Sequence, residues 1–467
     1  MHDRNQWARL TRSPRARVLT ALLAVVLVAG CATGSHAPAQ HPPTHSAVSS
    51  TDPGCLLAPA TCYAPHLLRV AYGIQPLLDH GIDGRGETVT VLDPAPAPNT
   101  PAGPPANPGA VPASGFFPAA STDIRQDLKA FDRLFHLPAA QIKTVTALAG
   151  SASPWQASVE EVADLEIVHL VAPAATLRVV LIPENALASA ASATADMLAG
   201  LRLAVSDTDV ASISFSLGEH AFTTAQVAQM QSTLATAAAS HVTVTAASGN
   251  FGAFSDTWAG ATAVKEVSLP ASDPLVLAVG GTTLTVDPST GGYVSETAWN
   301  QGTAFDTEPE ASAGGFSHLF ARPAYQDGVP GIGAMRGVPD VAADADQQGA
   351  PPMVFSVGGK TSITSAAGTS NSAPLWAGLI ALADQYAQHD LGPVNSTIYG
   401  IARGTGYHQA FHDITTGNNT LTLPYPAGTA GYPTAPGWDP VTGWGSPDAQ
   451  VLVPLLAGLT SPSPRPS

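Results

Sequence analysis

The sequence predicts an α/β fold in which helices cover both faces of a mostly parallel central sheet. The first observation is alternation, because strand-like apolar runs and helix-like segments follow one another over residues 87–247, as in parallel strands joined by crossover helices. The second is composition, because 467 residues that are 45% hydrophobic and only 12% charged can bury a large core. With 43 Gly and 42 Pro, the chain is rich in loops but too apolar to be disordered overall.

The expected strands and helices alternate in chain order. A strand over residues 87–92 ends at Asp93, and a helix is expected over 122–136. The remaining expected elements are a helix over about 158–171 and strands over 177–182, 209–216 and 242–247. The loops beyond the carboxyl ends of such strands are the expected place for catalytic residues.

A small-residue turn at residues 367–374 leads into an apolar run and predicts the start of a further helix. Ser370 in this turn would lie beside unpaired N–H groups and the positive end of the helix dipole. Gly368 allows a close backbone approach, and Pro374 suits the first turn of a helix. Ser370 is therefore a candidate nucleophile. The alternative is that Ser370 or Ser372 is only the helix N-cap.

The first thirty residues have the character of a targeting segment. Five arginines precede the apolar run 18–27, which is the order of a secretory signal peptide over residues 1–30. Residues 28–31 resemble a bacterial lipobox, so Cys31 is expected to be lipidated and to anchor the mature chain to the bacterial membrane at the cell surface. Plain secretion after cleavage near Ala32 is the alternative.

The mature chain is expected to be strongly acidic. Removing residues 1–30 takes away five arginines and Asp3, so the formal net charge falls from −16 to −20. An acidic chain is a poor partner for nucleic acid and for anionic membrane surfaces, which leaves a lipid on Cys31 as the expected membrane contact. The remaining cysteines, Cys55 and Cys62, are expected to pair as a short-loop disulfide in an oxidising compartment.

One large domain over residues 63–458 accounts for nearly all of the chain and is expected to act as a monomer. Residues 31–62, rich in Pro, Ser, His and Thr, are expected to form a flexible lipid-linked tether. A Pro-rich stretch at 94–120 without periodicity is expected to be a surface insertion. Residues 459–467 are expected to be a frayed tail.

A nucleophilic serine needs a base, and none of the fourteen histidines has a local signature for that role. The helix expected over 158–171 is a better source, because Glu160 and Asp164 lie one turn apart on the same face. Like charges at that spacing destabilise a helix by about 0.2–0.5 kcal/mol, whereas a pair that shares a proton acquires a perturbed pKa that suits acid–base chemistry. The alternative is that the two carboxylates belong to a solvated acidic face of the helix. The apolar Leu165 and Val168 argue against it, because they indicate that much of this helix is buried.

These motifs, with others in one order along most of the chain, resemble those of the sedolisins, which are serine-carboxyl peptidases with a subtilisin-like fold. The family's Glu-x-x-x-Asp helix, followed by Ala-Pro, matches residues 160–173, and its Gly-Thr-Ser-x-x-x-Pro turn matches residues 368–374. The further matching segments are residues 63–73, 270–284, 295–300, 314–317 and 338–344. The resemblance implies a subtilisin-like three-layer fold with a calcium loop near the C-terminus.

The resemblance also implies roles for three residues. Ser370 would attack the scissile carbonyl, Glu160 would be the general base, and Asp164 would orient Glu160. A carboxylate with a reference pKa of about 4.3 stays ionised in acid, where a histidine would be protonated, so acid-active proteolysis is expected. Asp93 falls near the position where many sedolisins hold a further acidic residue, although a strand end would also suit a turn cap.

Two C-terminal segments, residues 411–419 and 435–445, resemble the halves of the sedolisin calcium loop. The ligands that the resemblance implies for one structural calcium ion are the carboxylates of Asp413 and Asp439 and the backbone carbonyls of Ile414, Ala435 and Gly437. This set of oxygen donors suits a hard cation. Without the resemblance, both aspartates would be ordinary turn residues.

Asn250 departs from the family pattern. Sedolisins have an aspartate in this segment, which in its protonated form donates to the oxyanion of the tetrahedral intermediate. An asparagine amide donates at every pH, so we expect activity to reach a higher pH than with aspartate. A second departure is the short stretch between Cys31 and Tyr63, which leaves no room for the long prosegment of many sedolisins.

The expected function is that of an exported serine-carboxyl peptidase, of endopeptidase or tripeptidyl-peptidase type, which acts on proteins or peptides through an acyl-enzyme. The alternative is a surface lipoprotein that keeps the fold and binds peptides with little or no activity. Asn250 keeps this alternative open, while Ser370 with its two carboxylates argues against it. Histidine-dependent chemistry is disfavoured by the missing histidine motif. Phe215, where relatives often have tryptophan, indicates an altered substrate pocket.

Overall fold

The computed structural model describes residues 64–95, 123–148, 155, 157–183, 189–255, 264–302, 309–347, 349–357, 360–421 and 430–459. All of them belong to the larger of two units of the chain, Ala47–Ser467. The predictions for the signal peptide, the lipid on Cys31, the pairing of Cys55 with Cys62, and most of the tether, the insertion and the tail lie outside the described residues. Within the part that is described, no helix is both long and apolar enough to cross a membrane.

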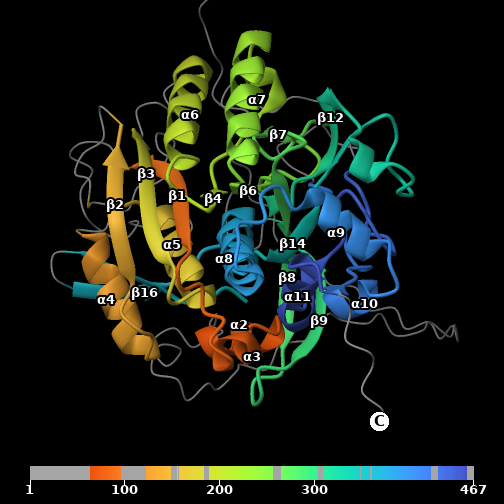
Figure 1. Ribbon diagram of the computed structural model, residues 1–467. Coiled ribbons are helices and arrows are strands. Elements are labelled where there is room, and N and C mark those ends of the chain that lie inside the picture. Colours follow the sequence, from red (N-terminus) through yellow and green to blue (C-terminus); the bar gives the residue numbers. More distant parts are fainter. Residues whose placement is uncertain are drawn as a thin grey trace, which may run out of the picture. The chain divides into compact units, whose positions relative to one another are not determined.

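A central sheet of eight strands organises this unit, in the order β14-β8-β6-β4-β1-β3-β2 (Figure 1). Neighbouring strands along this path are parallel, and β9 pairs antiparallel with β8. The strands are β1 (Thr88–Ala95), β2 (Gln141–Ala147), β3 (Thr176–Pro183), β4 (Val210–Ile213), β6 (Thr243–Ala247), β8 (Leu277–Val286), β9 (Tyr293–Ala298) and β14 (Val341–Asp344). The predicted α/β architecture with a mostly parallel sheet is confirmed.

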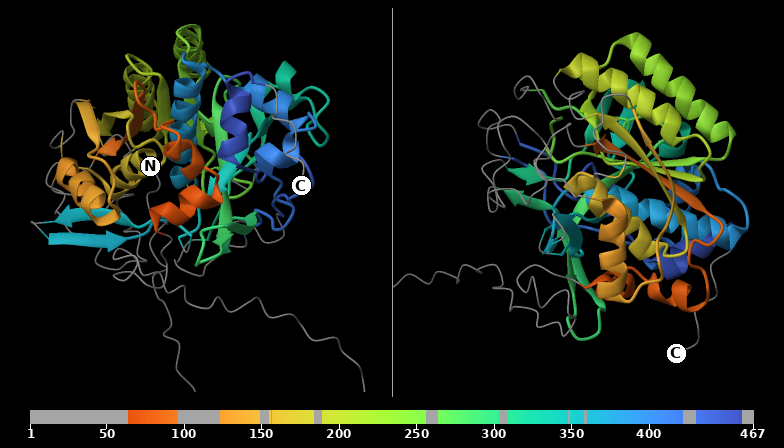
Figure 2. Two further views of the ribbon diagram at one scale, coloured as in Figure 1. Left: turned by 60° about the horizontal axis from the view of Figure 1, so that its bottom comes forward. Right: turned by 90° about the vertical axis from the view of Figure 1, so that its left-hand side faces the viewer.

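Helices cover both faces of the sheet and bury two apolar cores (Figures 1 and 2). Successive side chains of a strand point to opposite faces, so in β1 Val91 packs into the core beneath α5 and α8, whereas Leu92 packs beneath α6 and α7. The long helices are α4 (Ile124–Phe135), α5 (Val159–Val171), α6 (Ala190–Ala204), α7 (Thr224–Ala239) and α8 (Thr369–Ala387).

The smaller elements surround this three-layer body. The remaining helices are α2 (Pro65–Ala71), α3 (Gln75–Asp79), α9 (Asn395–Ala402), α10 (Tyr407–Ala410), α11 (Ala449–Leu456) and the 3₁₀ turns η2 (Glu219–Ala221) and η3 (Ala324–Gln326). The short strand pairs are β5 (Leu217–Gly218) with β7 (Ser268–Leu269), β10 (Asn300–Gly302) with β11 (Glu310–Ala311), β12 (Gly315–Ala321) with β13 (Met335–Val338), β15 (Met353–Val357) with β16 (Lys360–Thr364), and β17 (Phe411–His412) with β18 (Ser446–Pro447).

Helix α8 is the central helix, and residues 369–384 along it are all buried. It packs against α5 at Gly378, where an added Cβ would lie only 2.7 Å from the Cβ of Val171. Only glycine leaves room for the two helix backbones to approach this closely. Because α8 carries Ser370 and α5 carries Glu160, this contact joins the two helices on which the predicted catalytic residues lie.

Three predicted boundaries were wrong. Strand β4 ends at Ile213 rather than residue 216, because the chain leaves the central sheet and β5 pairs with β7 instead. Strand β1 continues to Ala95, where it pairs with Pro183 of β3, so the first two residues of the predicted insertion belong to the sheet. Pro374 lies inside α8, beyond its first turn.

The interior position of Pro374 has a local explanation. Proline has no N–H, so the carbonyl oxygen four residues earlier, that of Ser370, loses its usual helical partner. The hydroxyl of Ser214 lies 3.3 Å from this carbonyl oxygen and can donate to it. A side chain from the irregular segment after β4 thus replaces the missing backbone hydrogen bond.

Candidate active site

The candidate residues gather near the carboxyl ends of the central strands. Ser370 is the second residue of α8, Glu160 and Asp164 lie in α5, and Asn250 follows β6. Asp93 lies near the carboxyl end of β1. The first and last of these residues, Asp93 and Ser370, are more than 270 positions apart in the sequence. The structure brings them to the edge of the sheet where parallel α/β folds form their sites.

Ser370 begins the buried helix without capping it. The N-cap of α8 is Gly368, and no side chain caps the helix, so neither Ser370 nor Ser372 is the N-cap. Gly368 has φ +138°, a conformation that favours glycine, and an added Cβ would lie 2.9 Å from Ser370 Oγ. The N-terminal turn of a helix has N–H groups without helical partners, so the Ser370 hydroxyl faces a region where negative charge can be stabilised.

Glu160 is the candidate base nearest to this hydroxyl. The Ser370 side chain forms a hydrogen bond with the Glu160 carboxylate. Burial has the larger effect on the pKa of Glu160 and raises it, and this hydrogen bond lowers it. The net result is a pKa above the ordinary glutamate value. A nucleophile hydrogen-bonded to a carboxylate can pass its proton directly to that carboxylate.

Asp164 lies behind Glu160 and is fully buried. Burial raises its pKa well above the ordinary value, and the charges of Asp93 and Glu160 raise it further. The Asp164 carboxyl forms a hydrogen bond with the hydroxyl of Ser214. A hydroxyl has one proton, so if Ser214 donates to the carbonyl of Ser370, a protonated Asp164 must donate to Ser214. The raised pKa of Asp164 is consistent with that arrangement.

A row of five buried or half-buried carboxyl groups continues from Glu160 into the protein. We name Glu160, Asp164, Asp93, Glu161 and Asp127 the carboxyl row. Neither carboxylate oxygen of Asp93 has a donor among the described residues, and a proton on Asp93 or Asp164 would allow a hydrogen bond between these two neighbouring carboxyl groups. Burial and then the charge of Glu160 raise the pKa of Asp93, and burial followed by the charge of Asp93 raises the pKa of Glu161. The row therefore holds protons that isolated carboxylates would have lost.

These raised pKa values predict that the folded protein is most stable in acid. A carboxyl group whose pKa is raised by folding adds stability that is complete below its unfolded value of about 4 and is lost as the pH rises through the folded value. For Asp273, buried with a pKa of about 6, this loss is roughly 3 kcal/mol. We expect the free energy of unfolding of Ser370→Ala, measured by urea titration with a chelator present, to fall between pH 4 and 7. A rise in the free energy of unfolding over that pH range would contradict the raised pKa values of these buried carboxyl groups.

Asn250 faces the same space as the Ser370 hydroxyl. The backbone N–H of Thr369 donates to Asn250 Oδ1 at 3.0 Å, and Oδ1 also lies 3.0 Å from Thr369 Oγ1. Because a backbone N–H can only donate, the atom that receives it must be the amide oxygen, and the NH₂ group points the other way. A Cβ on Gly368 would lie 3.0 Å from Asn250 Nδ2 as well as close to Ser370 Oγ. The amide donors and the hydroxyl thus border one small space, which suits an oxyanion.

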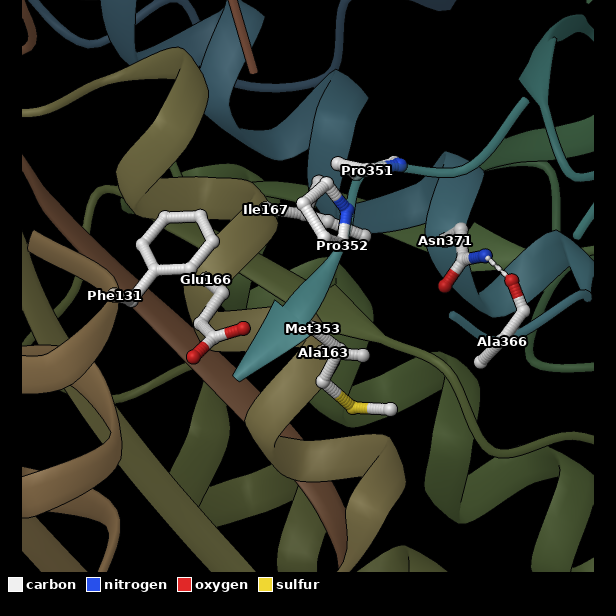
Figure 3. Close-up of a pocket in the computed structure, with 9 residues that line it drawn as sticks. All are labelled: Phe131, Ala163, Glu166, Ile167, Pro351, Pro352, Met353, Ala366 and Asn371. Atoms are coloured by element: carbon white, nitrogen blue, oxygen red, sulfur yellow. Dashed lines mark hydrogen bonds between the residues drawn. The ribbon is translucent and has the colours of Figure 1, made fainter. Parts of the chain in front are cut away.

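A small cavity lies beside Glu166 and Asn371, which are neighbours of the candidate catalytic residues in α5 and α8 (Figure 3). Its free volume of about 10 Å³ is enough for one water molecule and not for a peptide. Glu166 Oε2 accepts a hydrogen bond from the N–H of Val354 at 2.9 Å, while Oε1 has no partner among the described residues. Asn371, next to Ser370, is held on the cavity wall because it donates to the carbonyl of Ala366 at 2.7 Å. The cavity is a structural feature and not a substrate cleft.

The predicted calcium loop has the donors that a hard cation needs. Asp413 and Asp439 both act on the pKa of Tyr407, so their carboxylates lie near the same phenol. In the described part of the chain, the backbone carbonyls proposed as ligands accept no hydrogen bonds, and they belong to Ile414, Ala435 and Gly437. Two carboxylates with three unclaimed carbonyl oxygens fit a calcium ion. Asp413 also accepts a hydrogen bond from the N–H of Gly437, and Asp439 accepts from the N–H groups of Ala435, Val441 and Thr442, so the ligand set stays a prediction.

Sequence reasoning missed four residues that shape the site. Ser214 contacts Asp164 and the Ser370 carbonyl, and Thr369 orients Asn250. Glu161 and Asp127 extend the carboxyl row. Thr369 lies within the serine motif and could have been singled out. Glu161 lies next to Glu160 in the predicted helix 158–171 and could have been singled out too. Ser214 and Asp127 lie in segments whose local pattern gives no sign of a contact with the site.

The comparisons with known proteins agree with this geometry. A family model described as the subtilase family matches residues 146–410, which is more than half of the chain. The chain belongs to the subtilase family. The match includes Glu160, Asp164, Asn250 and Ser370, so every predicted catalytic residue lies within the subtilase region.

Among subtilase relatives, the similar proteins are sedolisins, which confirms the resemblance found in the sequence. Kumamolisin from Bacillus sp. (strain MN-32) is 34% identical over 314 residues, which cover 64% of this chain and 51% of kumamolisin. Sedolisin from Pseudomonas sp. (strain 101) is 36% identical over 220 residues, covering 47% of this chain and 35% of that protein. The chain thus spans about half or less of the relatives that it matches.

A solved structure confirms the subtilisin-like fold of this subtilase. The structure is that of Pseudomonas sedolisin, a serine-carboxyl proteinase, in complex with two molecules of pseudo-iodotyrostatin. Its TM-score is 0.65 at 24% sequence identity, and the match covers 85% of this chain and 99% of the sedolisin chain.

Proposed function

We propose that this chain hydrolyses peptide bonds through an acyl-enzyme, with Ser370 as the nucleophile and Glu160 as the general base. The observation that carries the proposal is the hydrogen bond between Ser370 and Glu160 beside the oriented amide of Asn250. A nucleophile, a base and an oxyanion donor are the three groups that acyl transfer requires. The similarity to kumamolisin and sedolisin supports the same assignment.

In the proposed reaction, Ser370 Oγ attacks the carbonyl carbon as its proton passes to Glu160. The carbonyl oxygen becomes an oxyanion, to which the NH₂ group of Asn250 donates. The C–N bond then breaks, Glu160 returns the proton to the leaving amine, and an ester on Ser370 remains. Water attacks this ester with Glu160 as the base again, which releases the acid and restores the serine.

The carboxylate base makes acid activity part of the proposal. Glu160 must be ionised to take the proton. Burial raises its pKa, and the Ser370 hydrogen bond acts in the opposite direction and favours the ionised form. A protonated Asp164 behind it would leave Glu160 as the carboxylate that carries the negative charge. The carboxyl row thus supports a base that works at a pH where histidine would already be protonated.

The substrates we propose are proteins or peptides, cleaved by endopeptidase or tripeptidyl-peptidase action. Tripeptidyl-peptidase 1 of Homo sapiens is 29% identical over 266 residues, which supports the tripeptidyl-peptidase type. The signal segment and Cys31 support export to the cell surface with a lipid anchor, and the acidic charge supports the absence of a nucleic-acid partner. A monomer suffices for this chemistry, because every proposed catalytic group comes from one chain.

The test is hydrolysis of a denatured protein between pH 3 and 8, with new N-termini counted by mass spectrometry. Ser370→Ala, purified in the same way, controls for contaminating peptidases. We expect cleavage by the wild type that is strongest in acid. The absence of cleavage at every pH would refute the function and would favour the peptide-binding alternative.

We also propose that one calcium ion stabilises the loop of Asp413 and Asp439. The ion would supply structural cross-linking of the two loop halves and no chemistry. Calcium at 100 times its dissociation constant is expected to stabilise the fold by about 2.7 kcal/mol, measured as a rise in Tm after removal of metal by a chelator. In Asp413→Asn this gain should shrink. An equal gain in wild type and Asp413→Asn would show that the loop does not hold the ion.

A further inference from the structure

The backbone that carries Asn250 is paired with a short extended stretch, residues 311–313. The N–H groups of Ala311 and Ala313 donate to the carbonyl oxygens of Asn250 and Gly249, each at 2.9 Å. These bonds fix the backbone of Asn250, whereas the contact with α8 described above fixes its side chain. The position of the amide therefore depends on where residues 311–313 lie.

Asn419, a fully buried residue, binds this stretch from its opposite edge. Its Nδ2 donates to the carbonyl of Ser312 at 3.1 Å, and its Oδ1 accepts from the N–H of Tyr432 at 2.6 Å. Successive residues of an extended chain direct their backbone groups to alternate edges, so Ser312 bonds here while its two neighbours bond to the segment of Asn250. One amide thus uses both its donor and its acceptor to hold residues 311–313 in place.

The backbone of Asn419 also contacts the segment of Asn250 directly. Gly252 lies two residues after Asn250 and has φ +63°, a conformation that favours glycine. An added Cβ on Gly252 would lie only 2.3 Å from the carbonyl oxygen of Asn419. The N–H of Asn419 in turn donates to the carbonyl of Tyr432 at 3.0 Å. Two separate contacts, one through Ser312 and one at Gly252, therefore connect Asn419 with the segment that carries Asn250.

We propose that Asn419 is a positioning residue that holds the amide of Asn250 where the oxyanion forms. Asn419 does not border the space beside Ser370 itself, and it acts through residues 311–313 and Gly252. Its side chain is closed to water, so no solvent molecule can replace its two hydrogen bonds when they are lost. Because the role of Asn250 belongs to the proposed peptidase function, the role of Asn419 rests on that function too.

The test compares Asn419→Asp with the wild type in steady-state hydrolysis of one peptide between pH 3 and 8. An aspartate here keeps the size of the side chain and the acceptor for Tyr432, but it can donate to Ser312 only when it is protonated. As the pH rises through the pKa of that carboxyl, we expect kcat relative to the wild type to fall by up to roughly 10²-fold, the effect of a small displacement of a catalytic group. KM should change little, since an oxyanion donor acts mainly in the transition state.

Asn418→Ala is the matched control. Asn418 directly precedes Asn419, but it is exposed, and its Oδ1 accepts from the N–H of Thr420 at 2.9 Å. It should keep kcat within a few-fold of the wild type at every pH. Asn419→Ala loses both hydrogen bonds of the amide and should lower kcat at every pH. If circular dichroism shows that Asn419→Ala does not fold, Asn419→Asp carries the test alone.

The decisive measurement repeats Asn419→Asp in the Asn250→Ala background. With no amide left to position, the second substitution should lower kcat little further, whereas a general loss of structure would lower kcat by the same factor in both backgrounds. Losses that multiply in the double variant would overturn the proposal, and so would wild-type kcat in Asn419→Asp at every pH. A wild type that cleaves nothing would refute the proposed function and this role with it, while an active wild type with an equally active Asn419→Asp refutes only this role.

Discussion

Replacing Ser370 with alanine is expected to lower kcat by roughly 10⁶-fold, the loss that follows when a nucleophile is removed from a serine triad. Glu160→Gln keeps the shape of the base but cannot accept a proton, and it is expected to cost about 10²–10⁴-fold. Both residues act in the same proton transfer, because the Ser370 hydroxyl is hydrogen-bonded to Glu160. The double variant should therefore be little slower than Ser370→Ala alone.

The measurement is steady-state hydrolysis of one peptide at acid pH, with circular dichroism to verify folding. Ser372→Ala is the matched control, because Ser372 lies two residues further along α8 and donates to the carbonyl of Ala343 instead of Glu160. It should retain activity within a few-fold. If Glu160→Gln keeps wild-type kcat, or if the losses of the two single variants multiply in the double variant, Glu160 is not the base.

Asn250→Ala is expected to lower kcat by about 10²–10³-fold with little change in KM, because an oxyanion donor acts mainly in the transition state. The folded structure should persist, since Asn250 is only half-buried and Thr369 loses one acceptor at the helix start. A change confined to KM would mean that Asn250 contacts substrate without stabilising the oxyanion.

The variant Asn250→Asp tests whether residue 250 must donate a hydrogen bond to the oxyanion, because aspartate keeps the size and position of the side chain. An aspartate here would accept the Thr369 N–H with one oxygen and could donate with the other only when protonated. Activity of the variant should therefore be lost as the pH rises through the pKa of that carboxyl, while the wild type continues to higher pH. Profiles of kcat/KM against pH provide the measurement, and coincident alkaline limbs would contradict the role of Asn250.

Sequence could predict the parts of this site that local pattern determines. Helix α5 and the serine turn each carry their residues on one short segment, where spacing alone sets which side chains share a face. The resemblance to sedolisins then implied that the two segments contribute to one site. The fold that it implied is confirmed by the central sheet and by the similar sedolisin structure. The calcium loop was predicted in the same way, and its ion stays a prediction.

The parts that failed depend on contacts between distant segments. Ser214 lies within hydrogen-bond distance of the carbonyl of Ser370 across 156 positions, and this contact explains why Pro374 is tolerated inside α8. The carboxyl row combines α4, α5 and β1, so its shared protons come from three segments that show no common pattern in sequence. Burial of this kind appears only when the sheet has assembled.

The close contact of α5 and α8 at Gly378 means that packing in the core sets the relative position of the candidate catalytic residues. The candidate base Glu160 lies on α5 and the candidate nucleophile Ser370 lies on α8, and an added Cβ on Gly378 would meet the Val171 side chain of α5. The distance between proton donor and acceptor is thus inherited from interior packing. A substitution that pushes α5 and α8 apart, even by adding a single methyl group far from the substrate, is expected to change the distance between Ser370 and Glu160 and so to act like a substitution in the active site.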